Sequence, residues 1–125
     1  MRQIKFRAWI YDGNIAEYKM TYSCKLSFFK DIVYAYIPED DYEYQLNPSN
    51  ITQFTGLLDK NGKEIYEGDI VIWPHLLNMK SLLIQWSNKE CGFVADTIDG
   101  KPDSWIDNSC EIIGNRFENP ELLEQ

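Results

Sequence analysis

The chain has 125 residues and a hydrophobic fraction of 44%, which suits one globular domain, or a small domain with an elaborated arm, and excludes a disordered chain. Twenty acidic and twelve basic residues give a net charge of −8, which disfavours general binding to a phosphate backbone and favours simple solubility. No apolar run approaches the roughly 20 residues needed to span a bilayer.

The first predicted elements are two strands joined by a turn. Residues 4–10 alternate between apolar and other side chains with a period of two, which is typical of a half-buried strand. Asp12-Gly13 follows as a turn signal, where we expect the glycine to supply a positive φ. A second strand is then expected at residues 15–20.

The next segment, residues 26–37, fits two structures. Its apolar residues are spaced as on a helix face, whereas its last four residues suit a strand. A helix is favoured for its first part. Residues 38–41 then predict an exposed acidic loop, residues 42–46 a short strand, and residues 47–50 a turn.

The C-terminal half is predicted to contain a hairpin followed by five short strands. Asn61-Gly62 between two apolar segments is the strongest short-range hairpin signal in the chain. Short strands at steps of about ten residues are typical of a small barrel or sandwich, and their number favours an SH3-like barrel. The expected strands are residues 70–73, 82–86, 93–98, 104–107 and 110–114.

The predicted fold class is therefore mainly β. We expect residues 1–50 to form a β-rich (α+β) N-terminal arm and residues 51–125 to form the SH3-like barrel, with the boundary between residues 47 and 56. Asn119-Pro120 is typical of a helix start, so about one helical turn should close the barrel. No internal repeat or low-complexity segment occurs.

Three sequence blocks, in order and spread along the chain, resemble the YopX-like proteins of phages and prophages. The blocks are residues 1–9, residues 53–57 with 59–71, and residues 111–115 with 118–123. The resemblance implies an SH3-like C-terminal fold. It implies no activity and transfers no catalytic residue.

The same blocks also have structural explanations. Gly68 is expected to adopt a backbone conformation that other residues avoid, and Asp69 to accept hydrogen bonds from N–H groups in the turn. Gly114-Asn115 is expected to end a strand. Most of the matching residues are therefore expected to shape the backbone.

We predict no enzyme, no cofactor and no metal site. The single histidine, His75, is expected in an exposed loop, and it cannot form an ordinary zinc site with three scattered cysteines. No glycine-rich phosphate loop is present, and pairs among twenty carboxylates arise by chance. No catalytic residue is therefore proposed from the sequence.

The cellular compartment is predicted from the cysteines and the N-terminus. Cys24, Cys91 and Cys110 are odd in number and without CxxC spacing, so we expect free thiols in a reducing cytosol. The N-terminal sequence lacks the apolar segment and cleavage site of a signal peptide. A cytoplasmic protein without membrane partners is expected.

The favoured function is a non-catalytic module that binds a host or phage protein. Trp73, Trp86 and Trp105 exceed what a small core readily hides, and SH3-like barrels often present aromatic grooves. The competing interpretation is that these tryptophans anchor the core, which we expect for at least two of them.

Three alternatives remain open. The net charge and the acidic residues within 39–43 suit a decoy that mimics DNA and binds a host nucleic-acid enzyme. Lys5, Arg7 and Trp9 share one strand face and suit weak binding of a single-stranded nucleic acid, against which the net charge argues. Edge strands of the arm could also pair between copies and form a homo-oligomer.

Overall fold

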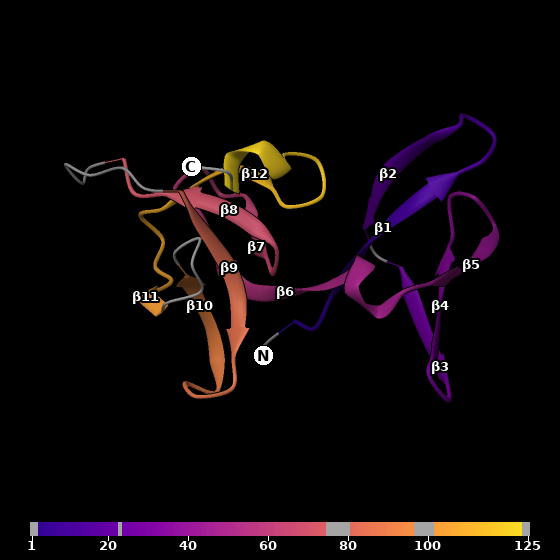
Figure 1. Cartoon of the computed structure of the whole chain (residues 1–125), viewed down its shortest axis with the longest axis horizontal. Helices are drawn as coiled ribbons and strands as arrows, with labels where there is room; N and C mark the ends of the chain where they lie inside the picture. Colours follow the sequence, from indigo (N-terminus) through magenta and orange to yellow (C-terminus); the bar gives the residue numbers. More distant parts are fainter. Residues whose placement is uncertain (1–2, 23, 75–80, 97–101, 124–125) are drawn as a thin grey trace. The chain divides into compact units, whose positions relative to one another are not determined.

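The computed structural model describes residues 3–22, 24–74, 81–96 and 102–123, with the side chains of residues 102–105 excepted. The structure is 57% strand and has no α-helix in these ranges, so the predicted mainly β class is confirmed. The two short 3₁₀ segments among these residues lack the length and apolar character needed to cross a membrane. The chain divides into two compact units, which are described separately (Figure 1).

The N-terminal unit, Gln3–Gln53, is built from antiparallel strands. Strand β1 pairs with β2 on one side and with the first residues of β6 on the other, while β3, β4 and β5 form a second sheet in that order. Ala8, Ile10, Ala35 and Ile37 form the buried core. The strands are β1 (Phe6–Asp12), β2 (Glu17–Tyr22), β3 (Lys25–Phe29), β4 (Ile32–Ile37), β5 (Tyr42–Leu46) and β6 (Ile51–Leu58), with the 3₁₀ turn η1 (Pro48–Asn50) before β6.

The segment that was expected to start as a helix forms the β3–β4 hairpin, so that prediction is wrong. Leu26 lies opposite Ala35 and Phe28 opposite Val33. Burial along β4 alternates strictly, with every second residue buried, as a half-buried strand requires. Aromatic and β-branched residues dominate this stretch and suit a pleated surface, which outweighs the coincidental helical spacing.

The turn after β1 forms as predicted, but its left-handed residue is Ala16 rather than Gly13. Ala16 has a φ of 55°, while Gly13 is not among the residues with positive φ. The Asp12 carboxylate accepts a hydrogen bond from the Asn14 N–H at 2.9 Å and holds the start of the turn. The side chain of Asp12 therefore shapes this turn more than the freedom of the glycine does.

The C-terminal unit, Phe54–Gln125, contains one curled, half-barrel sheet of five antiparallel strands in the order β11-β10-β9-β8-β12. The end of β6 pairs with β7 across the turn at Asn61-Gly62, so the predicted hairpin is confirmed. The expected C-terminal helical turn is the 3₁₀ turn η2 (Pro120–Leu123). The strands are β7 (Glu64–Tyr66), β8 (Asp69–Ile72), β9 (Leu82–Ser87), β10 (Gly92–Asp96), β11 (Pro102–Trp105) and β12 (Glu111–Asn115).

The turn into β8 is fixed by a glycine and a carboxylate. Gly68 has a φ of 91°, and the Asp69 carboxylate accepts a hydrogen bond from the Tyr66 N–H at 2.8 Å, as predicted for both residues. The backbone of Gly68 also donates to the carbonyl of Ile84 and accepts from the Arg116 N–H. This turn therefore joins three parts of the C-terminal unit through its backbone.

Asp59 is a second carboxylate that organises this unit. Its side chain is 4% exposed and accepts hydrogen bonds from the N–H groups of Asn61 and Lys63 at 2.9 Å each. Its other oxygen accepts from the Ile112 N–H at 3.1 Å. One side chain thus shapes the β6–β7 turn and attaches it to β12.

Candidate functional site

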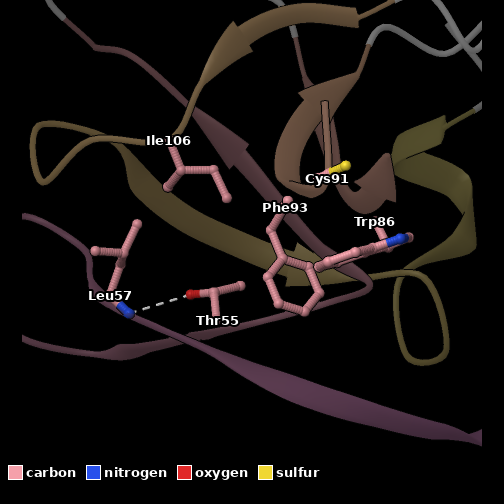
Figure 2. A pocket seen from close by; sticks show the side chains of 7 residues that line it. Thr55, Leu57, Trp86, Cys91, Phe93 and Ile106 are labelled. Atoms are coloured by element: carbon pink, nitrogen blue, oxygen red, sulfur yellow. Dashed lines mark hydrogen bonds between the residues drawn. The ribbon is translucent and has the colours of Figure 1, made fainter. Parts of the chain in front are cut away.

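A pocket of about 350 Å³ opens on the surface of the C-terminal unit (Figure 2). Strands β6, β9 and β10 supply most of its wall. Because all of its residues follow Gln53, the pocket lies within one unit. The lining residues are Thr55, Leu57, Trp86, Cys91, Gly92, Phe93 and Ile106.

Two aromatic rings dominate one wall of the pocket. Trp86 on β9 lies directly opposite Phe93 on β10, and their rings meet edge to face with centroids 5.2 Å apart (Figure 2). Trp86 is 47% exposed although it is the largest side chain in the lining. Its indole N–H already donates to Asn88 Oδ1 at 2.9 Å, so the ring offers a ligand its π face and apolar edge.

The opposite wall of the pocket is formed by an irregular stretch of β6. The pairing of β6 with β7 shifts register between Phe54 and Leu58, and Gly56 within this stretch has a φ of 91°. The Thr55 hydroxyl accepts a hydrogen bond from the Leu57 N–H at 3.2 Å (Figure 2). The same hydroxyl donates to the Ile65 carbonyl at 2.7 Å. The exposed side chain of Leu57 therefore projects from a backbone that is hydrogen-bonded to Thr55.

The side chains that line the pocket are mainly apolar and aromatic. Its one ionisable side chain is the thiol of Cys91, which is free and exposed, and none of the six other lining residues can act as a general base. Within the described ranges, no group of three or more potential ligands is placed to hold a metal ion. An apolar pocket with a few fixed polar groups suits a ligand that docks by shape and dispersion.

The predicted tryptophans have different environments. Trp73 is 7% exposed and belongs to the core of the C-terminal unit, where its indole N–H donates to Asp107 Oδ1 at 2.9 Å. Trp86 lines the pocket. The backbone of Trp105 pairs in β11, but its side chain lies outside the described residues, as does the whole of His75. Leu57 and Phe93, which sequence reasoning did not select, complete the pocket.

Lys5, Arg7 and Trp9 do not form an open basic face in the structure. Arg7 is 2% exposed, and its guanidinium donates to Thr52 Oγ1 at 3.0 Å. Lys5 and Trp9 are half-buried, and the Trp9 ring stacks on Tyr18 at 5.7 Å. Because Arg7 is covered, this face offers a phosphate group less positive charge than the strand pattern suggests.

The acidic loop is partly neutralised from within the N-terminal unit. Asp40 pairs with Lys19 at 3.0 Å and accepts a hydrogen bond from the Tyr44 hydroxyl at 2.8 Å, and these bonds lower the pKa of Asp40. Burial and the Asp40 carboxylate raise the pKa of Tyr44 to about 12. Asp41 accepts from the Tyr36 hydroxyl at 2.7 Å. Two of the loop's carboxylates are thus engaged internally.

Asp96 at the end of β10 is a buried carboxylate whose Oδ1 has no hydrogen-bond partner in the described part of the chain. Burial raises its pKa above the ordinary value of 3.8, so the unfolded state loses its proton at lower pH than the folded state. Stability should therefore fall as the pH rises from the unfolded pKa through the higher folded pKa.

We expect Asp96→Asn to stabilise the protein by about 1 kcal/mol at pH 7, because the amide removes a buried charge while keeping its shape. Urea unfolding between pH 4 and pH 8 measures this difference, which should shrink toward the acid end. A difference that does not change with pH would show that the pKa of Asp96 is the same in the folded and unfolded states.

Nearly the whole chain is similar to known proteins. The sequence matches the family described as YopX protein over residues 5–124. Among solved structures, the crystal structure of protein EF1440 from Enterococcus faecalis is similar, with 26% sequence identity and a TM-score of 0.59. The match covers 98% of this chain and 99% of that chain. No curated protein sequence matches.

Proposed function

The chain belongs to the YopX family, and on that premise we propose that it is a non-catalytic phage or prophage accessory protein that binds a peptide segment of a partner protein in its aromatic pocket. The same proposal includes an SH3-like barrel for the C-terminal unit. The curled sheet of five short antiparallel strands supports this fold. Barrels of this type commonly bind extended peptides in aromatic grooves.

The observation that carries the proposal is the exposure of Trp86 beside Phe93 in the pocket. A tryptophan that stays in contact with water forgoes a large hydrophobic stabilisation, which a bound apolar group would supply. Tryptophan is also enriched among the residues that contribute most to protein interfaces. The hydrogen bonds that hold the wall at Thr55 and Leu57 should lower the entropic cost of binding.

Charge indicates what kind of segment fits. Thirteen of the twenty acidic residues follow Gln53, together with six of the twelve basic ones, so the unit that holds the pocket is acidic. The lining itself is apolar and aromatic. We therefore expect an extended segment with a proline that stacks on the rings and with lysine or arginine beside it.

The test is binding of a displayed peptide library to the purified chain, followed by titration of the selected peptide. We expect Trp86→Ala to weaken binding by tenfold or more, about 1.4 kcal/mol or above. The melting temperature should change little, since the side chain is half exposed. Tyr11→Ala, which removes an equally exposed aromatic ring from the N-terminal unit, is the matched control and should leave affinity unchanged.

Two results would count against this function. Binding that survives Trp86→Ala combined with Leu57→Ala would exclude the pocket as the site. Capture of a host nuclease or polymerase that is released by DNA or salt would favour the acidic decoy, which the net charge of −8 suggests.

A further inference from the structure

Strand β3 is an exposed, apolar edge of the sheet β3-β4-β5. Phe28 and Phe29 at its end are 71% and 64% exposed, which makes them two of the most exposed large apolar side chains of the described residues. An edge strand presents a row of backbone N–H and C=O groups that can pair with another strand, and apolar edges are those that do so most readily.

We propose that two copies of the chain pair through β3, antiparallel and about a two-fold axis at Ser27. This interface is independent of the pocket, because it uses residues of the N-terminal unit alone. The two three-stranded sheets would then become one continuous six-stranded sheet. A two-fold axis is the commonest symmetry of protein dimers, and it requires a surface that complements itself.

The sequence of β3 is self-complementary about Ser27. An axis at Ser27 places Leu26 of one copy opposite Phe28 of the other, and Lys25 opposite Phe29. The two-fold symmetry makes each of these pairs occur two times. Directly opposed side chains in antiparallel strands contact one another. The first pair is apolar, and the second places an ammonium group beside an aromatic ring, so no like charges are directly opposed.

The structure supports both kinds of contact. Leu26 and Phe28 lie opposite Ala35 and Val33, both of which are buried, so the apolar pair would extend the core face of the sheet. The ring of Phe29 already accepts a cation, because Lys30 Nζ lies 5.7 Å from its centroid.

Charge also favours this edge over other surfaces of the chain. Residues 3–53 contain seven acidic and five basic side chains, so repulsion between two such units is small. The other edge of the same sheet, β5, carries the exposed carboxylate of Glu43, whereas the charged residue of β3, Lys25, would face an aromatic ring in this pairing. The partner that fits the β3 edge is therefore the β3 strand of a second copy of the chain.

Analytical ultracentrifugation of the full chain tests the interface. We expect a mass of two chains for the wild type and of one chain for Phe28→Glu, with unchanged circular dichroism. Tyr42→Glu, which changes another exposed aromatic residue, on the β5 edge, is the control and should remain dimeric. A wild type that stays monomeric at all concentrations, or a dimer that survives Phe28→Glu, would overturn the proposal.

Cross-linking tests the register. In a Cys91→Ser background, Ser27→Cys should form a disulfide-linked dimer on mild oxidation, because the two cysteines face each other at the axis. Ser49→Cys, an exposed serine away from β3, should stay monomeric under the same conditions. Equal cross-linking of both would contradict the register. Trp86→Ala should leave the dimer intact, so this proposal and the peptide-binding function fail or succeed separately.

Discussion

Replacing Trp73 with alanine is expected to lower the free energy of unfolding by about 4 kcal/mol, which is typical of deleting a large aromatic side chain from a core. Trp73 lies with Val71 and Leu82 in the buried cluster of the C-terminal unit. The substitution leaves a cavity and also removes the indole N–H that donates to Asp107. Urea unfolding followed by circular dichroism measures the loss without relying on tryptophan fluorescence.

The matched control for Trp73→Ala is Trp86→Ala, which removes the same side chain from the surface. We expect it to cost less than about 1 kcal/mol, because the exposed ring contributes less burial. Similar losses for the two variants would contradict the assignment of Trp73 to the core and Trp86 to the pocket.

Asp59→Ala is expected to destabilise the protein by about 3 kcal/mol, since three backbone N–H groups lose their acceptor at once. The side chain is 4% exposed, so water cannot fully replace it. Burial acts to raise the pKa of Asp59, but the N–H groups of Ile112, Lys63 and Asn61 outweigh it and lower the pKa overall. The variant should show a reduced urea midpoint with an unchanged slope.

The pH dependence of this effect has a defined sign. Because the folded pKa lies below the ordinary value of 3.8, the contribution of Asp59 is complete above that value and is lost as the pH falls through the folded pKa. The difference between wild type and Asp59→Ala should therefore narrow in acid. Glu90→Ala, an exposed carboxylate, is the control, and a comparable loss there would argue against the role of Asp59.

Local patterns predicted much of the fold. The short strands of the C-terminal half, the Asn61-Gly62 hairpin and the positive φ of Gly68 each depend on a few neighbouring residues, and each is confirmed. The prediction of a helix at the start of segment 26–37 was wrong, because helical and strand spacings coincide in a short apolar run. In this segment, β4 is stabilised by pairing with β5, and the pattern of residues 26–37 alone gives no information about that partner strand.

The candidate site was only partly predictable for the same reason. Trp86 was selected by residue type, but Leu57 and Phe93 join it through a register shift in β6 and a pairing across the β9–β10 turn. Arg7 was expected on an open face because it alternates with apolar residues. Its burial depends on Thr52, 45 positions away, whose hydroxyl accepts the guanidinium hydrogen bond.

The three cysteines differ in a way that makes each one a natural probe of a different event. Cys91 is exposed, Cys24 is half-buried in the N-terminal unit, and Cys110 is fully buried in the C-terminal unit. Burial raises the pKa of Cys110 to about 11, so little reactive thiolate exists while that unit is closed. A thiol reagent added in excess would label Cys91 at once. The labelling rates of Cys24 and Cys110 would report how fast the N-terminal and C-terminal units open. A comparison of these two labelling rates in the native chain would therefore show whether its two units unfold independently.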